Sequence, residues 1–488
     1  MNKLPLPASH PRPSRQLFIC GSGEFGLLGM GTDVIGELSE PHPHAWVETA
    51  VQSNLLGMEE GAGIEQACAG GMHSLIIDEA GKVWSWGVND NGALGRQIFG
   101  VSDPDAPGQL IDSDILESQP MLVRNLVGDG FRAVQIAVGD SVSVALSDEG
   151  LIRAWGCFRS GDGPLGFDYK AVHKEPQLYP MALELPTESR CVQVVCGGDH
   201  VLALTQEGTV FSWGNGEHAE LGRKLIERRK RNGLIPTRLP LRRIIYVAAG
   251  SYHSFAIDED GNVFAWGLNA YRQTSIFSTE SENEDDDIVW VPTEVRAFAP
   301  EILGRGRRVV QICGGEHHSI FLLNDGSVFG CGRCDGFELG LARDHPNIRA
   351  LEEAGSSDSS LSGKSTSGAF TYIATPTLIR FPPPPTPQDP DPPLAPANVR
   401  SVPNPIAHIT TSARHNIAVS RTGHAYAWGL GQMSELGLGE SVSQQQTPRR
   451  VRCREFDELR LDGLGWKWVV EDAAAGGQHS LFVVRMTE

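Results

Sequence analysis

A histidine that recurs at fixed distances from a glycine and a tryptophan is the first candidate for chemistry in this chain. His73 precedes Gly81 by eight residues, and Gly81 precedes Trp86 by five. The same intervals start again at four further histidines, namely His200, His253, His318 and His415. An imidazole can serve as a general acid or base near neutral pH. A histidine repeated at one position of equivalent units is nevertheless expected to pack or hydrogen-bond alike in each, so we predict a mainly structural role.

The residue that precedes each repeated position varies in type, unlike the histidine itself. In chain order these residues are Met72, Ser141, Asp199, Tyr252, His317, Arg414 and Gln478. A position that differs among equivalent units is free of the architectural constraint and can serve binding. The sequence has no G-x-S-x-G elbow, Walker loop or H-E-x-x-H pair. We therefore predict a surface that binds a macromolecule rather than a pocket that breaks a bond.

These histidines belong to a repeated unit whose clearest copy is Ile64–Gly95. It reads as three short apolar strands with a glycine turn, followed by an N-x-x-G-x-L-G loop. Another copy has Val142 in the histidine place, and the chain ends share one more copy, with His479 in one half and Cys20 in the other. Closing a ring in this way leaves no terminal sheet edge unpaired. We predict an all-β fold, a seven-bladed β-propeller closed by pairing of the N- and C-terminal half-blades.

The spacing of the units also predicts the domain organisation. Residues 1–16 are Pro-rich and should form a disordered lead-in, and residues 17–488 should form the ring. Loop insertions are expected at 223–243 and 276–290. The Ser/Gly- and Pro-rich composition of 352–400 cannot form a core, so this insert is expected to be disordered. Counting the shared copy as blade 1, Ile64–Gly95 begins blade 2.

Composition narrows the class of partner. The formal net charge of −19 argues against non-specific nucleic-acid binding by the ring as a whole, and fits either a basic protein partner or simple solubility. Nine cysteines, an odd number scattered among predicted strands, fit reduced thiols inside a cell. No apolar run approaches the roughly 18 residues needed to cross a bilayer. We expect no membrane contact.

Two stretches leave alternatives open. The basic segment Arg223–Arg243 could direct the protein to the nucleus, make a weak DNA contact through phosphates, or form a solvated loop. The pair Cys331-x-x-Cys334 has the spacing of a zinc or redox motif. It lacks a second pair, and Cys331 merely occupies the tryptophan place of its unit, so we predict no metal site.

The loop that ends the third unit is longer than its equivalents. Trp155 and Leu165 are ten residues apart, whereas Trp86 and Leu94 are eight apart. The two extra residues fall in C-F-R-S-G-D-G-P-L-G, whose Gly-Asp-Gly tip favours a hairpin turn. We predict a projecting hairpin at this position.

Short sequence segments of individual units resemble those of the regulator of chromosome condensation family. The matching segments are AGGMHS with VNDNGALGR, CFRSGDGPLG, GGDHVLALT, AYRQ, CGGEHHS and AAGGQHSLFVV. The resemblance implies a guanine nucleotide exchange factor for the small GTPase Ran, without a cofactor or a covalent intermediate. It further implies a nuclear, monomeric protein linked to chromatin through core histones or the nucleosome. Members often begin with a basic tail, whereas residues 1–16 contain only Lys3, Arg12 and Arg15 as basic Lys or Arg side chains.

The resemblance also assigns site residues. In that family a third-blade hairpin, the wedge, presses on the GTPase near its phosphate-binding loop and helps to eject Mg²⁺ and nucleotide. By motif match, catalytic roles fall on Asp140, Arg159 and Asp199. Contacts with the GTPase fall on His73, Phe158, Ser160, Gly161, Asp162, Tyr252, His317, His318 and His479.

Three other classes of protein are alternatives to an exchange factor. A propeller adaptor without exchange activity would have the same repeats and acidity, but not the blade-specific words. The light-sensing branch of the superfamily relies on a tryptophan before the repeated histidine, and no unit here has one. A hydrolase would need a nucleophile–base pair, and none is visible in the sequence.

Overall fold

Each repeat folds as a small antiparallel sheet because its strands are short, apolar and separated by tight turns. In the second repeat, β4 (His73–Asp78) and β5 (Val83–Gly87) are joined by a turn at Gly81, whose φ of 75° lies in the left-handed region that favours glycine. The computed structural model describes residues 1–34, 36–104, 106–127, 130–170, 174–277, 287–357, 372–395, 403–463 and 465–487.

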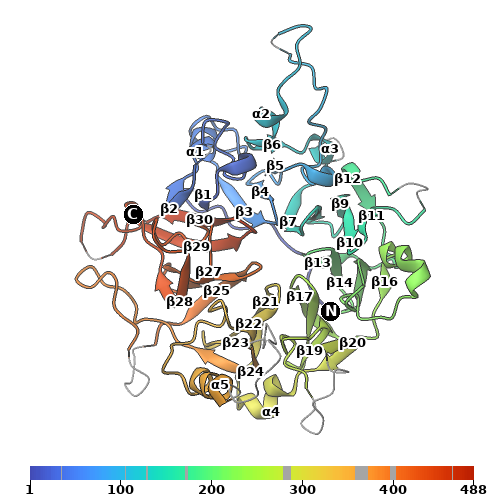
Figure 1. The fold of residues 1–488 in the computed structure, drawn as a ribbon. Helices are drawn as coiled ribbons and strands as arrows, with labels where there is room; N and C mark the ends of the chain where they lie inside the picture. Colours follow the sequence, from blue (N-terminus) through green and yellow to red (C-terminus); the bar gives the residue numbers. More distant parts are fainter. Residues whose placement is uncertain are drawn as a thin grey trace.

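Seven four-stranded sheets surround a central axis, which confirms the predicted all-β propeller (Figure 1). Blade 2 contains, innermost strand first, β3 (Ile64–Ala69), β4 (His73–Asp78), β5 (Val83–Gly87) and β6 (Met121–Leu122). Blade 3 contains β7 (Ala133–Val138), β8 (Val142–Ser147), β9 (Ile152–Gly156) and β12 (Gln177–Leu183). Blade 4 contains β13 (Cys191–Cys196), β14 (His200–Thr205), β15 (Val210–Gly214) and β16 (Thr237–Arg238).

The remaining complete blades have the same order. Blade 5 contains β17 (Ile244–Ala249), β18 (His253–Asp258), β19 (Val263–Leu268) and β20 (Ile288–Glu294). Blade 6 contains β21 (Val309–Gly314), β22 (His318–Leu323), β23 (Val328–Arg333) and β24 (Tyr372–Ile379). Blade 7 contains β25 (Ile406–Thr411), β26 (His415–Ser420), β27 (Ala425–Leu430) and β28 (Gln444–Arg450). The α-helices lie in the connections and are α1 (Ala45–Gln52), α2 (Ser113–Glu117), α3 (Arg124–Val127), α4 (Pro300–Leu303) and α5 (Pro346–Ser357).

The two chain ends build blade 1 together, as predicted. Its inner strands are β29 (Trp468–Ala475) and β30 (His479–Met486), and its outer strands are β1 (Gln16–Gly21) and β2 (Leu38–Pro43). β1 pairs with β30 in antiparallel register, with Leu17 opposite Val483. The ring is therefore closed by backbone hydrogen bonds between the first and last strands of the chain.

A hydrogen-bond pattern, seen in full between blades 4 and 5, ties neighbouring blades together at most junctions of the ring. Between blades 4 and 5, His200 Nε2 lies 2.8 Å from Ser254 Oγ, and this hydroxyl donates to the Glu220 carbonyl at 3.0 Å. The indole Nε1 of Trp266 donates to the same carbonyl at 2.7 Å. Since the serine hydrogen goes to the carbonyl, the histidine must donate its Nε2–H to the hydroxyl oxygen.

The histidine contact is present at six of the seven junctions. The pairs are His73–Ser143, His200–Ser254, His253–Ser319, His318–Asn416, His415–Ser480 and His479–Ser74. At His318 the acceptor is Asn416 Oδ1, at 2.7 Å, which again requires the Nε2–H tautomer. A Cβ at Gly197 would lie 2.1 Å from the His200 ring, which explains why a glycine stands three residues before this histidine.

These contacts correct the assignment of His73, His318 and His479 to a GTPase-binding surface. All three are at most 1% exposed, and each ring lies between two blades. In every copy that carries histidine at the repeated position, the side chain makes a structural contact with the next blade. The initial expectation of a mainly structural role holds for these residues as well.

The N-terminal segment is not a disordered lead-in. Asn2 Nδ2 donates to the carbonyls of Thr205 and Ile244, which belong to blades 4 and 5. Arg12 pairs with Glu79 at 3.0 Å in blade 2. Arg15 pairs with Glu471 at 2.7 Å in blade 1. Figure 1 shows the N-terminus near β17 and β14, and these contacts carry the segment from blades 4 and 5 past blade 2 to blade 1.

The Pro-rich insert is also partly ordered, contrary to expectation. The outer strand of blade 6, β24, lies within it, and Phe381 packs edge-on against Tyr426 and Trp428. An apolar strand and an aromatic anchor within a polar, Pro-rich stretch were masked by its average composition. Residues 358–371 and 396–402 of the insert lie outside the described part of the chain.

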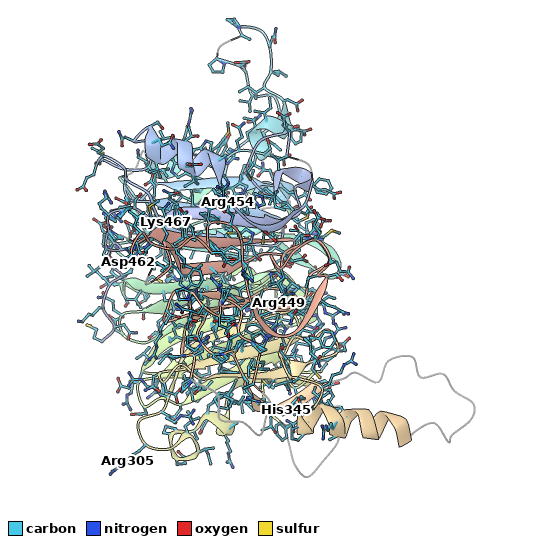
Figure 2. The ribbon with its side chains drawn as sticks, turned by 90° about the vertical axis from the view of Figure 1, so that its left-hand side faces the viewer. Arg305, His345, Arg449, Arg454, Asp462 and Lys467 are labelled. Carbon is cyan, nitrogen blue, oxygen red and sulfur yellow. The ribbon has the colours of Figure 1, made fainter. Side chains whose placement is uncertain are left out.

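Of the two other predicted insertions, 223–243 is described, whereas residues 278–286 of 276–290 lie outside the described part of the chain. Strand β16 and the 3-10 helix Glu227–Leu234 lie within 223–243, and β20 begins at Ile288 within 276–290. Helix α5 lies at the periphery of the ring (Figure 1) and projects beyond one of its two faces (Figure 2). Of the helices in the described ranges, none combines the length and the apolar character needed to span a bilayer.

Candidate functional site

The seven variable residues that precede the repeated position lie at one end of the central axis. Each is in the loop between the first and second strands of its blade. The neighbouring residues Gly71, Asp140, Gly198, Ser251 and Gly477 line one shared depression at the mouth of the channel. We call this surface the rim; it consists of Met72, Ser141, Asp199, Tyr252, His317, Arg414 and Gln478 with the loops that carry them.

The predicted hairpin of blade 3 is present beside the rim. It consists of β10 (Phe158–Ser160) and β11 (Gly163–Gly166), with Ser160 paired to Gly163 across the turn. Arg159, Gly161 and Asp162 are exposed at its tip. We refer to Phe158–Gly166 as the wedge hairpin.

Phe158 belongs to the core rather than to a contact surface, which corrects its assignment to GTPase binding. Its side chain is 1% exposed and stacks on Phe167 with ring centroids 6.0 Å apart. It packs in the cluster shared by blades 3 and 4, next to Val142 and Val201. An apolar residue at the base of a hairpin anchors it, and the polar residues beyond it remain available for a partner.

We therefore expect Phe158→Ala to destabilise the protein by about 3–5 kcal/mol, because a large buried aromatic side chain is replaced by a cavity. The urea midpoint of unfolding measures this loss. Arg159→Ala, one residue further along the same strand, should change the free energy of unfolding by less than about 0.5 kcal/mol. Equal stability of the two variants would show that Phe158 is not an anchor.

The wedge hairpin lies at the one junction that lacks the interblade pattern. Here Val142 replaces the histidine and Val201 replaces the serine, and both are buried. Trp213 Nε1 is buried without a hydrogen-bond partner, whereas its equivalents donate to the loop of the preceding blade. Replacing both polar partners with apolar groups avoids leaving one of them unpaired. The blade 3 loop is thus released from the contact that fixes the corresponding loops elsewhere.

Carboxylates of blade 4 hold the hairpin instead. The Arg159 backbone N–H donates to Asp199 Oδ1 at 2.7 Å, and the Gly161 N–H donates to Glu217 Oε2 at 2.7 Å. Lys230 Nζ bridges Glu217, at 2.8 Å, and Asp162 at the tip, at 3.0 Å. The contacts of Glu217 and Lys230 with the hairpin could not be predicted from the sequence, because no spacing rule connects these residues to a loop about 60 residues away.

The electrostatic environment of Asp199 sets it apart from an ordinary surface carboxylate. Partial burial and the nearby Asp140 carboxylate raise the pKa of Asp199 to about 7, although hydrogen bonding to the Arg159 N–H opposes the shift. Burial likewise raises the pKa of Asp140, while the Arg159 guanidinium acts in the other direction. Asp140, Arg159 and Asp199 therefore form one interacting group beside the hairpin.

Aromatic and imidazole rings continue the surface across blades 4, 5 and 6. Tyr252 lies 5.2 Å from the His218 ring and 6.0 Å from the His317 ring. Tyr271 stacks on His317 with centroids 4.6 Å apart. The structure thus brings together Tyr252 and His317, as expected, and adds His218 and Tyr271. Rings that are half exposed at a rim provide large contact area at low entropic cost.

The array ends in paired charges between blades 6 and 7. The Arg333 guanidinium lies 5.4 Å from the Tyr271 ring and pairs with Asp335 at 2.5 Å. Arg414 pairs with the buried carboxylate of Glu338 at 2.6 Å. The face therefore changes from acidic near Asp199 to a mixture of both signs near Arg414.

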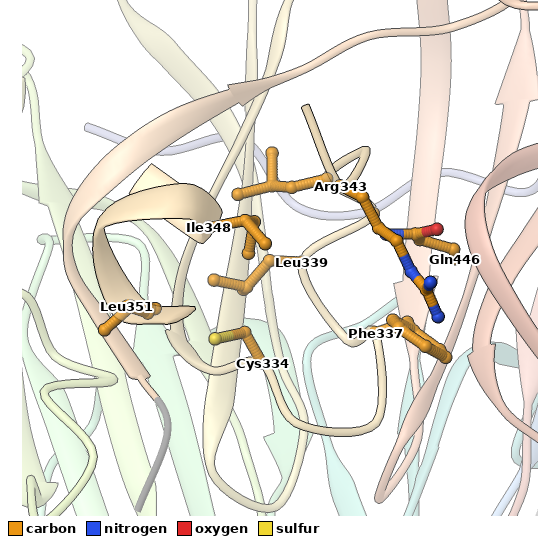
Figure 3. A pocket seen from close by; sticks show the side chains of 9 residues that line it. Cys334, Phe337, Leu339, Arg343, Ile348, Leu351 and Gln446 are labelled. Carbon is orange, nitrogen blue, oxygen red and sulfur yellow. The ribbon is translucent and has the colours of Figure 1, made fainter. Parts of the chain in front are cut away.

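A separate cavity of about 410 Å³ lies beside helix α5 (Figure 3). Its lining is mainly apolar, and Cys334 is the sulfur-bearing member. Burial raises the pKa of this thiol to about 12, and no histidine or carboxylate lines the cavity. Within the described ranges, no three His, Cys, Asp or Glu side chains are grouped to hold a metal ion.

A closed ring of seven repeats, with one hairpin-bearing face of carboxylates and rings, defines a seven-bladed repeat propeller. The chain belongs to the RCC1-like domain family, whose model matches residues 16–482. Relatives include Protein pim1 of Schizosaccharomyces pombe, 33% identical over 99% of this chain and 76% of the relative. Guanine nucleotide exchange factor SRM1 of Saccharomyces cerevisiae is 34% identical over 93% of this chain and 86% of the relative.

A solved structure has the same architecture. The crystal structure of Prp20p from Saccharomyces cerevisiae, described with its binding to Gsp1p and histones, superimposes with a TM-score of 0.77. The two chains are 28% identical, and the match covers 99% of this chain and 94% of Prp20p. The membership of the regulator of chromosome condensation family that the blade-specific sequence segments suggested is confirmed.

Proposed function

We propose that this chain is a guanine nucleotide exchange factor for the small GTPase Ran. The observation that carries the proposal is the wedge hairpin, whose backbone is held by Asp199 and Glu217 beside the rim. It is supported by the relative named as a guanine nucleotide exchange factor and by the Prp20p structure described with Gsp1p.

The geometry suits exchange without covalent chemistry. A GTPase holds its nucleotide through backbone N–H groups, a lysine and Mg²⁺. The exposed tip residues Arg159, Gly161 and Asp162 would displace the phosphate-binding loop, and the carboxylates of Asp140 and Asp199 would attract the lysine that binds phosphate. The nucleotide-free GTPase then binds this face best. By linkage, the same preference lowers the affinity of the GTPase for nucleotide.

The rest of the rim provides the docking contacts. Tyr252, His218 and His317 form a partly exposed array, backed by the buried Tyr271, on which a partner loop can pack. Ser160 lies at the turn of the hairpin, where its hydroxyl donates to the Gly163 carbonyl at 3.2 Å. Ser160 would thus set the shape of the tip that meets the GTPase.

We assign the protein to the nucleus and propose core histones as a second partner, since the Prp20p structure is described with histones. DNA contact through 223–243 receives less support. Arg223 donates to the Ile235 carbonyl, Arg231 to the Asp168 carbonyl, and Lys230 pairs with Asp162. Several cations of this segment are therefore occupied within the ring.

Release of fluorescently labelled GDP from purified Ran, with and without this protein, tests the proposal. We expect release to accelerate by about a hundredfold at catalytic amounts of the protein, near the upper end of the range that coupling free energies of about 1–3 kcal/mol give. A propeller adaptor would bind Ran or another partner and leave the release rate unchanged. Size-exclusion chromatography of the free protein should give a monomer.

A further inference from the structure

A group of four arginines on the outer side of the ring is not explained by the proposed function. Arg449, Arg450, Arg452 and Arg454 follow one another at the end of β28 and in the turn beyond it. In a chain with a formal net charge of −19, this is a second local concentration of positive charge in addition to the basic segment 223–243. Figure 2 shows Arg449 and Arg454 on the side of the ring, away from Arg305 at its far end.

Two of the four side chains are fixed within the protein. Arg450 is 2% exposed; it donates to the Pro390 carbonyl at 2.6 Å and lies 4.5 Å from the Trp466 ring. Arg452 donates to Asp457 Oδ2 at 2.8 Å. Asp457 also pairs with Arg450 at 3.1 Å, so one carboxylate holds both guanidinium groups in place. They form a rigid, positively charged wall.

The other two side chains are available. Arg449 and Arg454 are exposed, and neither makes an ion pair or a side-chain hydrogen bond within the part of the chain that is described. They line a cavity of about 320 Å³ together with Arg450, Arg452, Glu40 and Asp457. The lining thus contains four cationic and two acidic groups, and the positive charge is not balanced.

We propose that this cavity binds a phosphate monoester, as carried by a phosphorylated serine or threonine of a partner peptide. Guanidinium groups bind phosphate through paired, charge-assisted hydrogen bonds, and arginine clusters are the usual recognition element for phosphorylated peptides. The pre-positioned Arg450 and Arg452 lower the entropic cost of forming such a site.

The surroundings favour a phosphopeptide over a nucleic acid. Glu40 lines the cavity, and Asp391 lies 4.0 Å from Arg452. Duplex DNA presents a continuous row of phosphates, which these carboxylates would repel. A peptide with one phosphate can instead place a neighbouring lysine or arginine against Glu40. We infer specificity for a phosphorylated residue with a basic neighbour.

Isothermal titration with three probes tests the site: a nonapeptide with one phosphoserine flanked by arginines, its unphosphorylated counterpart, and inorganic phosphate. We expect the phosphopeptide to bind, inorganic phosphate to compete with it, and the unphosphorylated peptide to bind at least about tenfold more weakly. The exposed pair is then removed as Arg449→Ala/Arg454→Ala, which should weaken phosphopeptide binding by about tenfold or more. Arg305→Ala removes an exposed arginine elsewhere and should have no effect.

Equal affinity of the two peptides, or binding that survives the double substitution, would overturn the proposal. A 20-base-pair duplex that binds more tightly than the phosphopeptide and is lost with the same double variant would reassign the site to nucleic acid and likewise overturn it. Exchange on Ran is not involved in these measurements, so their outcome is independent of the proposed function.

Discussion

Asp199→Ala is expected to slow the GDP release that this protein stimulates on Ran by about tenfold to a hundredfold. The Asp199 carboxylate accepts the Arg159 backbone N–H at 2.7 Å and so positions the wedge hairpin. A hydrogen bond to a charged group contributes about 1.5–3 kcal/mol, and 1.4 kcal/mol corresponds to a factor of ten in rate. The rate of labelled GDP release, measured at a saturating concentration of Ran, gives the effect directly.

The amide variant separates positioning from charge. Asp199→Asn retains an oxygen that can accept the Arg159 N–H, but it removes the negative charge. If the charge takes part in exchange, the wild-type rate should rise with pH through about 7, where the carboxylate ionises, and Asp199→Asn should be slow and show no such rise. Glu207→Ala, an exposed substitution at the opposite end of blade 4, should behave as wild type. Wild-type exchange by Asp199→Ala would remove this residue from the mechanism.

Acidification below about pH 6.5 is expected to destabilise the ring steeply. The interblade histidines are buried, and burial lowers their pKa, to about 3 for His73, His200, His253 and His415 and to about 4 for His479. Their Nε2–H is committed to the next blade, and Nδ1 of His200 and His253 is buried without a partner. Protonation there would create a buried charge with no acceptor.

The sign follows from these lowered values. The unfolded chain binds protons below about pH 6.5, whereas the folded ring does not until its own lower values are reached. Each such histidine therefore stabilises the fold above pH 6.5, and this contribution is lost by about 1.4 kcal/mol per pH unit as the pH falls further. With several histidines acting together, the urea midpoint should drop steeply between pH 6.5 and 4.

A matched pair of variants checks the origin of this slope. His253→Gln keeps an N–H that can reach the hydroxyl of Ser319 but removes one titrating group, so it should lower stability at pH 7 and flatten the pH dependence. His42→Ala removes an exposed histidine and should change neither. An unfolding midpoint that is the same at pH 7 and pH 5 would contradict the assignment of neutral, buried histidines.

Repetition made the fold accessible from the sequence. The fixed intervals from His73 to Gly81 and Trp86 exist because each blade must present the same donor and the same turn to its neighbour, and this local constraint is visible in every copy. The half-copies at Cys20 and His479 implied closure for the same reason. Averaged composition was less reliable, since it assigned disorder to a stretch that contains β24 and the buried Phe381.

Such local patterns located the candidate site but did not distinguish its buried residues from its exposed ones. A motif match does not distinguish Phe158, which faces the core, from Arg159, which faces solvent, because neighbouring residues of a strand point to opposite sides. Likewise, the side chain of His317 is partly exposed, whereas that of His318 is buried. The substitution of Val142 for histidine was a visible signal, but its meaning emerged only when Val201 and Trp213 were found across the same junction.

The sequence by itself determined the seven-bladed ring, its closure and the family, since these follow from short-range periodicity that every blade repeats. The tertiary structure alone decided which polar groups meet from distant parts of the chain. Glu217 and Lys230 of blade 4 reach the wedge hairpin of blade 3 through loop packing, and ring closure brings Glu40 of blade 1 to the cavity lined by Arg449 and Arg454. Contacts of that kind depend on the relative placement of blades, which no interval between residues encodes.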